Sequence, residues 1–195
     1  MAAAPTAPKS SGYWAVPIAR AVVALVAAGV VTFNSNHSAT FGLVVFGAYA
    51  VVGGLLVGIL SWRSVADRTV RRLFVAHGVI GVIAGVLALA LSTSGLGLFL
   101  YLVSVWAALT GFIELYCGLR SRSKDPSSRD WIIVGAFTAV LALVFLLIPS
   151  DSVLAVGLFG AYAVIVGVYL AIGGFSLKWA AQHPSTAEHP MESGS

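Results

Sequence analysis

Three ionisable side chains lie inside long apolar stretches of the sequence: Arg20, His77 and Glu114. Together they offer a positive charge, an imidazole and a carboxylate, which can form an ion pair or can take up and release protons. A charge at the centre of a membrane helix costs about 2.5–3.5 kcal/mol on insertion scales, so such residues usually face protein and pair. We therefore expect a buried Arg20–Glu114 ion pair with His77 beside it.

The three side chains share one depth and one kind of helix face. Each lies five or six residues from the end of its apolar stretch, which places it roughly 7–9 Å inside the membrane boundary. Small residues share the face of each side chain, and such residues mark surfaces where membrane helices pack together. The side chains should thus point into a helix bundle. Arg20 and His77 occupy equivalent positions of an internal repeat, and we expect Phe137 at that position of the third copy.

Each residue also has a simpler interpretation that the sequence leaves open. Arg20 can extend to the lipid head groups, His77 can be a packed core histidine, and Glu114 can be a structural partner of Arg20 rather than a proton-handling carboxylate. The sequence contains no phosphate-binding loop, no metal-ligand spacing and no nucleophile motif. We therefore expect no catalytic residue, no metal and no cofactor, in a protein that is not an enzyme.

The composition indicates which elements hold these side chains. Of the 195 residues, 59% are hydrophobic and only 9% are charged, whereas a soluble domain carries about 25% charged residues. Continuous apolar runs have the roughly 20 residues that span a bilayer and are too long for barrel strands. The runs cover residues 14–33, 39–62, 73–92, 96–119, 131–148 and 153–177. The sequence predicts an all-α polytopic membrane protein with six transmembrane helices.

The loops between these runs are of two kinds that alternate. Eight of the 11 Lys and Arg residues lie in the longer segments 63–72 and 120–130, and the three short polar loops contain none. Cations that flank membrane spans are retained in the cytoplasm, so both basic segments and both termini are expected there. We interpret the charges as a topology signal, accompanied by contact with lipid head groups, and expect no nucleic acid as a partner.

The chain contains an internal repeat. The sequence FGAYAV occurs at residues 46–51 and again at 159–164, each time in a glycine-rich run that follows a short loop. Because every copy begins and ends on the same side, the copies are parallel and are related by an axis near the membrane normal. The predicted hairpins cover residues 13–62, 73–119 and 131–178, between tails at 1–12 and 179–195 that we expect to be disordered.

Glycines in these runs predict where the helices touch. Without a hydrophobic force between helices in lipid, association depends on the close approach of backbones at small residues. The glycines expected to pack helices together are Gly54, Gly58, Gly81, Gly85, Gly111 and Gly167.

The order of these features resembles a known family. Three predicted hairpins, Trp14 followed by Arg20 at the opening, FGAYAVVGG in the second run and WAALTGFIEL in the fourth are similar to the HdeD-type acid-resistance membrane proteins. The resemblance covers about residues 13–178, and Arg20 and Glu114 match positions where many relatives carry Arg and Glu. Ala21 differs from the glycine that relatives often have after the arginine.

The resemblance implies a bacterial inner-membrane protein built from a short repeat of unknown biochemical function, with some members linked to survival in acid. We accordingly expect a non-enzymatic protein of acid or envelope stress tolerance, whose partners are the lipid bilayer and a second copy or another membrane protein. One alternative is a transporter that conducts protons or a small solute through Glu114 and His77. Another is an accessory subunit of a membrane complex.

Overall fold

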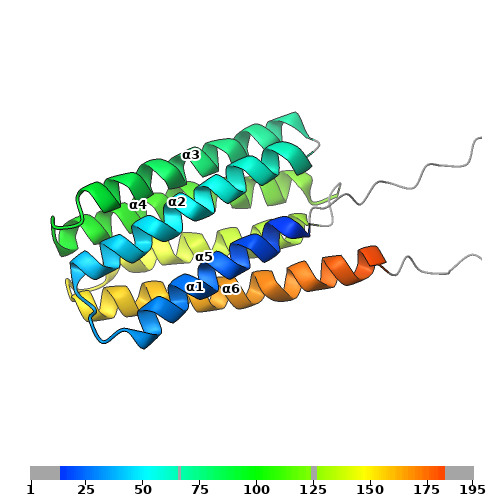
Figure 1. Ribbon diagram of the computed structural model, residues 1–195. Helices are drawn as coiled ribbons and strands as arrows, with labels where there is room; N and C mark the ends of the chain where they lie inside the picture. Colours follow the sequence, from blue (N-terminus) through cyan, green and yellow to red (C-terminus); the bar gives the residue numbers. More distant parts are fainter. Residues whose placement is uncertain (1–13, 66, 124–126, 183–195) are drawn as a thin grey trace, which may run out of the picture.

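The computed structural model describes residues 14–65, 67–123 and 127–182. These residues form six α-helices and no β-strand (Figure 1). The helices are α1 (Ala15–Phe33), α2 (Ala39–Ser64), α3 (Arg68–Ala90), α4 (Leu96–Ser121), α5 (Ser128–Leu147) and α6 (Ser152–Gln182). Each helix is long and apolar enough to cross a membrane, judged by length and composition. The predicted fold class, an all-α polytopic membrane protein, is confirmed.

The basic segment between α2 and α3 is more helical than expected. Helix α3 begins at Arg68, because the side chain of Asp67 accepts hydrogen bonds from the N–H groups of Thr69 and Val70 at 2.7 and 3.1 Å. Such capping satisfies two of the unpaired N–H groups at a helix start. The expected loop over residues 63–72 is therefore wrong for most of its length, since a helix can continue beyond its apolar run outside the lipid.

The chain enters and leaves the bundle at one end (Figure 1). This end also carries the α2–α3 and α4–α5 connections and the arginines on and beside the adjoining helix ends, and we name it the basic end. Helix α6 ends there at Gln182, so residues 179–182, expected in the C-terminal tail, are helical. Alanines favour helix at this point, and the next residues lead into Pro184. The expected N-terminal tail, residues 1–12, and the remainder of the expected C-terminal tail 179–195, residues 183–195, lie outside the described residues.

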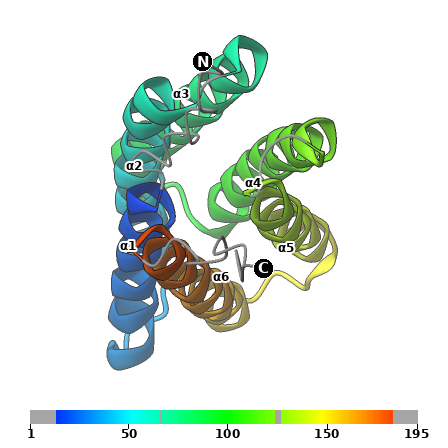
Figure 2. The same ribbon diagram turned by 90° about the vertical axis from the view of Figure 1, so that its right-hand side faces the viewer.

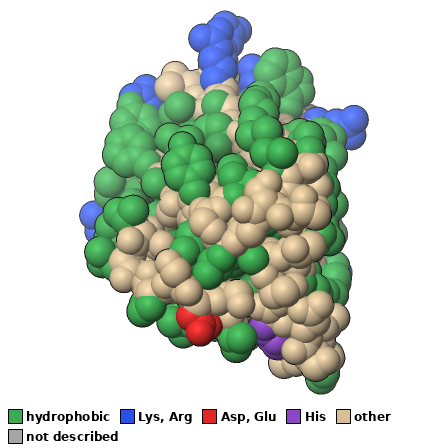
Figure 3. Space-filling model, turned by 90° about the vertical axis from the view of Figure 1, so that its left-hand side faces the viewer, with side chains coloured by type: hydrophobic (Ala, Val, Ile, Leu, Met, Phe, Trp, Pro, Cys, Tyr) green, Lys and Arg blue, Asp and Glu red, His purple; other side chains and the backbone are tan. Residues whose placement is uncertain are grey.

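The remaining surface is apolar where lipid would contact it. Figure 3 looks onto the opposite end, which carries the other connections, and shows Lys and Arg side chains only at the margin of the view. Large hydrophobic side chains on the outward helix faces are exposed, among them Phe112, Leu146 and Leu147. In water this surface would be costly, whereas hydrocarbon accommodates it.

The helices form a ring of closely packed pairs. The closest packing joins α2 with α3, α4 with α5 and α6 with α1, and helices of one predicted hairpin pack more loosely (Figure 2). The last helix thus returns to the first and closes the ring. The pairs stand around a common axis along the bundle, as expected for parallel repeats. The hairpin boundaries themselves stay a prediction.

Glycine sets the register of each pair. A Cβ atom added at the glycine would come within 2.8–3.2 Å of a backbone nitrogen on the partner helix, so a larger residue does not fit. The glycine and backbone nitrogen pairs are Gly54 with Val82, Gly111 with Ala139, and Gly167 with Leu25. These residues are equivalent in the repeat, so the pairs share one geometry.

This register corrects one expectation. Gly78 and Gly135 make equivalent close contacts with α2 and α4, which aligns the residues that precede them, His77 and Val134. Val134 is 1% exposed and points into the bundle, whereas Phe137 is 39% exposed on the outward face. The expectation of Phe137 at the position equivalent to Arg20 is therefore wrong, because backbone contacts at small residues align the copies.

The other glycines expected to pack helices differ in how tightly they are held. Gly81 and Gly85 approach the backbone of α2 closely, with Ala50 O at 3.1 Å and Gly47 O at 2.6 Å from an added Cβ. Gly58 is different, because an added Cβ there would meet only the Cα atom of Gly78, at 3.8 Å. The backbones of α2 and α3 are also close at Gly58, since a Cβ added at Gly78 would lie 2.9 Å from Gly58 N, but the space in the direction of a Gly58 side chain is open.

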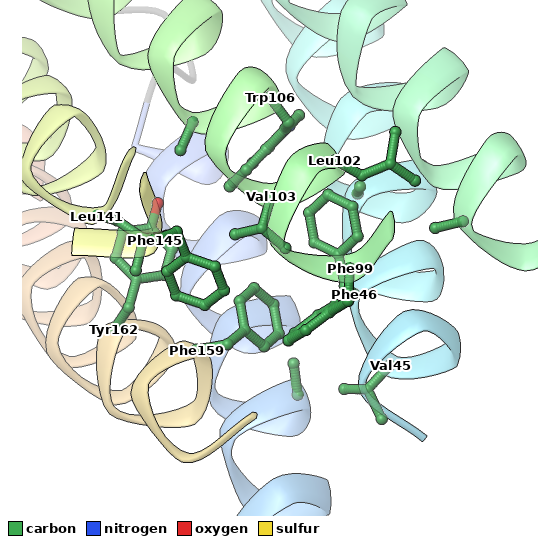
Figure 4. Packing of buried hydrophobic residues seen from close by; sticks show 14 of the residues in the cluster. Val45, Phe46, Phe99, Leu102, Val103, Trp106, Leu141, Phe145, Phe159 and Tyr162 are labelled. Atoms are coloured by element: carbon green, nitrogen blue, oxygen red, sulfur yellow. The ribbon is translucent and has the colours of Figure 1, made fainter. Parts of the chain in front are cut away.

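Aromatic side chains fill the axis in the half of the bundle away from the basic end (Figure 4). Phe46, Phe99 and Phe159 converge from α2, α4 and α6, with ring centroids 5.7–6.4 Å apart and edge-to-face geometry. Phe46 also contacts Trp106 at 5.4 Å, and Trp106 contacts Tyr162 at 6.4 Å. Such pairs add about 0.5–1.5 kcal/mol each beyond the area they bury.

The glycine contacts lead to a stability prediction. Gly54→Ala places a Cβ 2.6 Å from the Gly78 carbonyl oxygen, so we expect a loss of about 1–3 kcal/mol in unfolding free energy from overpacking. The matched control is Gly58→Ala, which we expect to be neutral or stabilising by up to about 1 kcal/mol. Unfolding of the purified protein from mixed micelles, followed by circular dichroism, measures both. Equal stability of the two variants would contradict the packing account.

Candidate functional site

The three ionisable residues come together at one level of the bundle. The repeat register puts Arg20 of α1, His77 of α3 and Glu114 of α4 in a layer to which the remaining helices contribute apolar side chains. Those side chains are Val57, Val134 and Leu170, all buried. In the first helix of the three copies, this layer therefore contains Arg20, His77 and Val134. In the second helix it contains Val57, Glu114 and Leu170. The six positions share the backbone geometry of the repeat, but only three of the six side chains are ionisable.

The Arg20 guanidinium and the Glu114 carboxylate form a direct ion pair. Arg20 Nη2 donates a hydrogen bond to Glu114 Oε1 at 2.5 Å. The glutamate side chain is 1% exposed and the arginine side chain 15% exposed. The arginine thus points toward the carboxylate and not along the surface to the head groups. A charge-assisted bond of this kind is stronger than a neutral one, and each charge offsets part of the other's desolvation.

The pair crosses the centre of the bundle. Helix α1 packs against α6 and α2, and α4 packs against α3 and α5, so the two helices face each other across the ring (Figure 2). The ion pair therefore connects two helices that are not neighbours in the ring. It joins α1 and α4 across the axis, where these two helices do not pack closely against each other.

His77 lies beside this pair without completing it. Its Nδ1 atom is 3.9 Å from Glu114 Oε1, and the two side chains form a salt bridge only when His77 is protonated. The ring also contacts Phe74, with centroids 6.3 Å apart. Among the described residues, His77 Nδ1 and Glu114 Oε2 have no hydrogen-bond partner. Buried polar atoms usually find partners, so these two atoms mark the place where the cluster can accept a further polar group.

A small polar cavity adjoins the cluster. It has a volume of about 20 Å³, enough for roughly one water molecule. Its polar lining comprises Arg20, Tyr49, His77, Thr110, Thr138 and Tyr162. The Thr138 hydroxyl donates to the Val134 carbonyl at 2.8 Å and lies 2.9 Å from the Tyr162 hydroxyl. Hydroxyl groups thus surround the side of the cluster that faces the membrane centre.

A second, smaller void of about 10 Å³ lies on the other side of Arg20, toward the basic end. Asp130 and Trp131 line it together with Arg20. The Tyr169 hydroxyl donates a hydrogen bond to Asp130 Oδ1 at 2.8 Å. Arg20 therefore separates the polar cavity from a void that borders a carboxylate near the surface.

Sequence reasoning finds the charged members of this site and misses its hydroxyl groups. Tyr49 and Tyr162 both belong to the FGAYAV repeats, and Trp106 is their counterpart in α4. A tyrosine at the same position of two copies was the signal available. Asp130 was equally visible in the sequence as an acid at the start of an apolar run. Neither pattern indicates a partner until the fold is known.

The arrangement can hold charge and can bind one small polar molecule. Among the described residues, no group of three or more His, Cys, Asp or Glu side chains is placed to hold a metal ion. The ion pair, the imidazole and the hydroxyls are the groups available for proton transfer. Beyond them, Phe46, Phe99 and Phe159 fill the axis toward the opposite end.

Comparison with known proteins shows that part of the chain is similar to a recognised sequence family. Residues 76–148, from α3 to the end of α5, match a family model described as a short repeat of unknown function (DUF308). This family contains HdeD-like membrane proteins. No curated protein and no solved structure matches the chain. The matched segment includes His77 and Glu114, but not Arg20.

The ion pair gives a prediction for paired substitutions. Arg20→Glu and Glu114→Arg each leave a buried charge without its partner, and we expect each to cost about 3–5 kcal/mol of stability. The double exchange should recover most of that loss, because the pair is restored with reversed sign. Thermal unfolding in detergent measures all three. Pairing is refuted if the double exchange is as unstable as the single changes combined.

A second double variant separates a structural role from a chemical one. Arg20→Met with Glu114→Leu replaces the pair by apolar side chains of similar size, a change that is often neutral or stabilising for buried pairs. We expect it to fold with near-normal stability. It then serves as a folded protein without charges for the functional assays below.

Proposed function

We propose that the protein is a non-enzymatic inner-membrane protein of the HdeD type, which contributes to acid or envelope stress tolerance as a sealed helix bundle. The observation that supports the proposal is that buried side chains fill the axis of the helix bundle. Side chains from several helices meet there at successive levels, and the levels are closed by different interactions. A bundle packed in this way acts through its surface and its stability.

The first level is the Arg20–Glu114 ion pair, which spans the axis between opposite helices. Roughly 12 Å further from the basic end, at 1.5 Å per residue, Tyr49, Trp106 and Tyr162 form an aromatic level. The phenylalanines from α2, α4 and α6 close the axis beyond it. Solutes would have to displace large buried side chains at each level, which favours a structural role over conduction.

The family match supports the HdeD assignment, since it falls on the central repeat and on the α4–α5 contact. The distribution of cations supports an inner-membrane location with both termini and the basic end in the cytoplasm. Reporter fusions that are active only in the cytoplasm, placed at both termini and in the α1–α2 connection, test the orientation. Activity in the connection with none at the termini would reverse it.

A second candidate is proton transport. The observation that favours it is the pair of unpartnered buried atoms, His77 Nδ1 and Glu114 Oε2, next to a cavity lined by hydroxyl groups. These groups could pass a proton to the void that borders Asp130 on the other side of Arg20. Transport would still require an opening through the phenylalanine level.

Proton flux decides between the two candidates. The protein is reconstituted into liposomes and an outward or inward pH gradient is imposed, with a pH-sensitive dye inside. For the sealed bundle we expect flux no greater than in protein-free liposomes. Flux that is present in the wild type and lost in Glu114→Gln, with both proteins folded, would replace the proposal by proton transport. His77→Gln serves as a second variant if Glu114→Gln does not fold.

The stress role has its own test in the source bacterium. Deletion of the gene should lower survival after an acid shock, and the wild-type gene should restore it. The folded double variant Arg20→Met with Glu114→Leu should restore survival as well, because the proposal assigns the pair a structural task. Unchanged survival of the deletion strain under both acid and envelope stress would remove the stress role.

A further inference from the structure

A groove on the lipid-facing surface lies between α2 and α3, beside the open position at Gly58. It has a volume of about 550 Å³, within the roughly 300–1,000 Å³ of typical ligand sites. Gly54, Gly58 and Gly78 form its floor, because they have no side chains to fill it. Its walls are apolar and consist of Leu55, Ile59, Val75, Val79, Val82 and Ile83.

Glycine at position 58 distinguishes α2 from the equivalent helices of the other two repeat copies. The residues equivalent to Gly58 are Leu115 in α4 and Ala171 in α6, and both have a side chain at a position where α2 has none. The floor of the α2–α3 groove is also held open, since tight backbone contacts at Gly54 and Gly78 prevent the two helices from closing further. The floor of the hollow is therefore set by the backbone packing of the two helices.

Cationic side chains stand at the basic end of the groove. Trp62 and Arg63 line it there, and the Arg71 guanidinium carbon lies 5.1 Å from the centroid of the Trp62 ring. Arg71 Nε is buried and has no hydrogen-bond partner within the part of the chain that the structure describes. The acid nearby, Asp67, is engaged in capping α3.

From these observations we propose that the groove binds an anionic phospholipid of the leaflet at the basic end. One acyl chain lies along the apolar walls, and the phosphate group contacts Arg63 and Arg71. The apolar part and the cationic part are arranged along the membrane normal in the same order as the tail and head group of a lipid. Guanidinium groups bind phosphate in a bidentate manner, and basic sites between membrane helices bind anionic head groups.

A second groove offers an internal control. It lies between α1 and α2, has a volume of about 360 Å³, and its described lining residues carry no charge. Acyl chains can contact it, but it lacks a head-group site. The comparison separates general contact with lipid tails from recognition of an anionic lipid.

Native mass spectrometry of the full chain, titrated with phosphatidylglycerol or phosphatidylcholine, tests the proposal. We expect the wild type to prefer phosphatidylglycerol. Because a cation near the membrane surface contributes about fivefold in affinity, Arg63→Gln with Arg71→Gln should weaken phosphatidylglycerol binding about 25-fold. The charge-matched control is Arg120→Gln with Arg122→Gln, which removes cations at the end of α4 and should keep the preference.

Filling the groove tests the acyl-chain site. Gly58→Leu should abolish the preference for phosphatidylglycerol, and Val79→Trp, on an exposed wall position, does the same from the other helix if Gly58→Leu does not fold. Ala48→Leu in the uncharged groove is the control and should have no effect on the preference. Each variant is first checked for normal helix content and elution volume.

Three results would overturn the proposal. The first is a preference that survives loss of Arg63 and Arg71, and the second is an equal loss in the Arg120 and Arg122 control, which would indicate unspecific electrostatics. The third is a wild-type dimer, detected by light scattering, that Gly58→Leu converts to a monomer. That result would make a second copy of the chain the occupant of the groove.

Discussion

Lipid tails are as apolar as the side chains that face them, so helices in a bilayer gain little by hiding hydrophobic surface from their surroundings. Close backbone contact takes the place of that force here. Gly54, Gly111 and Gly167 each bring their helix against a backbone nitrogen of the partner helix. Because these positions are equivalent in the repeat, they define the helix pairs, the closed ring and the level at which every other side chain meets the axis.

The polar cluster follows from that ring. Arg20 and Glu114 lie on helices that face each other across the axis, and they reach one another because the glycine contacts set both helices in register. The repeat also explains why the cluster is asymmetric. Val134, in the place equivalent to Arg20 and His77, leaves the third copy without a charge. The three copies thus share one backbone arrangement, but only two of them have ionisable side chains at this level. The copies also differ at Gly58, where the other two have a larger residue, and the lipid-facing groove lies beside this glycine.

The two halves of the bundle differ in the side chains that lie along the axis. Aromatic side chains from alternate helices interlock beyond the ion pair and give the bundle a rigid, filled half. His77 Nδ1 and Glu114 Oε2, both buried, border the more polar half near the basic end. The first half is thus filled by aromatic rings, whereas the second half holds the groups able to change their charge.

Local properties of the chain were sufficient to predict the membrane helices, the alternation of basic and polar connections, and the common depth of Arg20, His77 and Glu114. Apolar length and charge position act within one segment, so they can be read without knowing its neighbours. The start of α3 at Asp67, the place of Val134 and the hydroxyls of Tyr49 and Tyr162 could not be obtained with the same certainty. The first depends on a cap that competes with the apolar pattern, and the others depend on contacts between helices far apart in the sequence. Those contacts exist only once backbone packing at the glycines has chosen which helices meet.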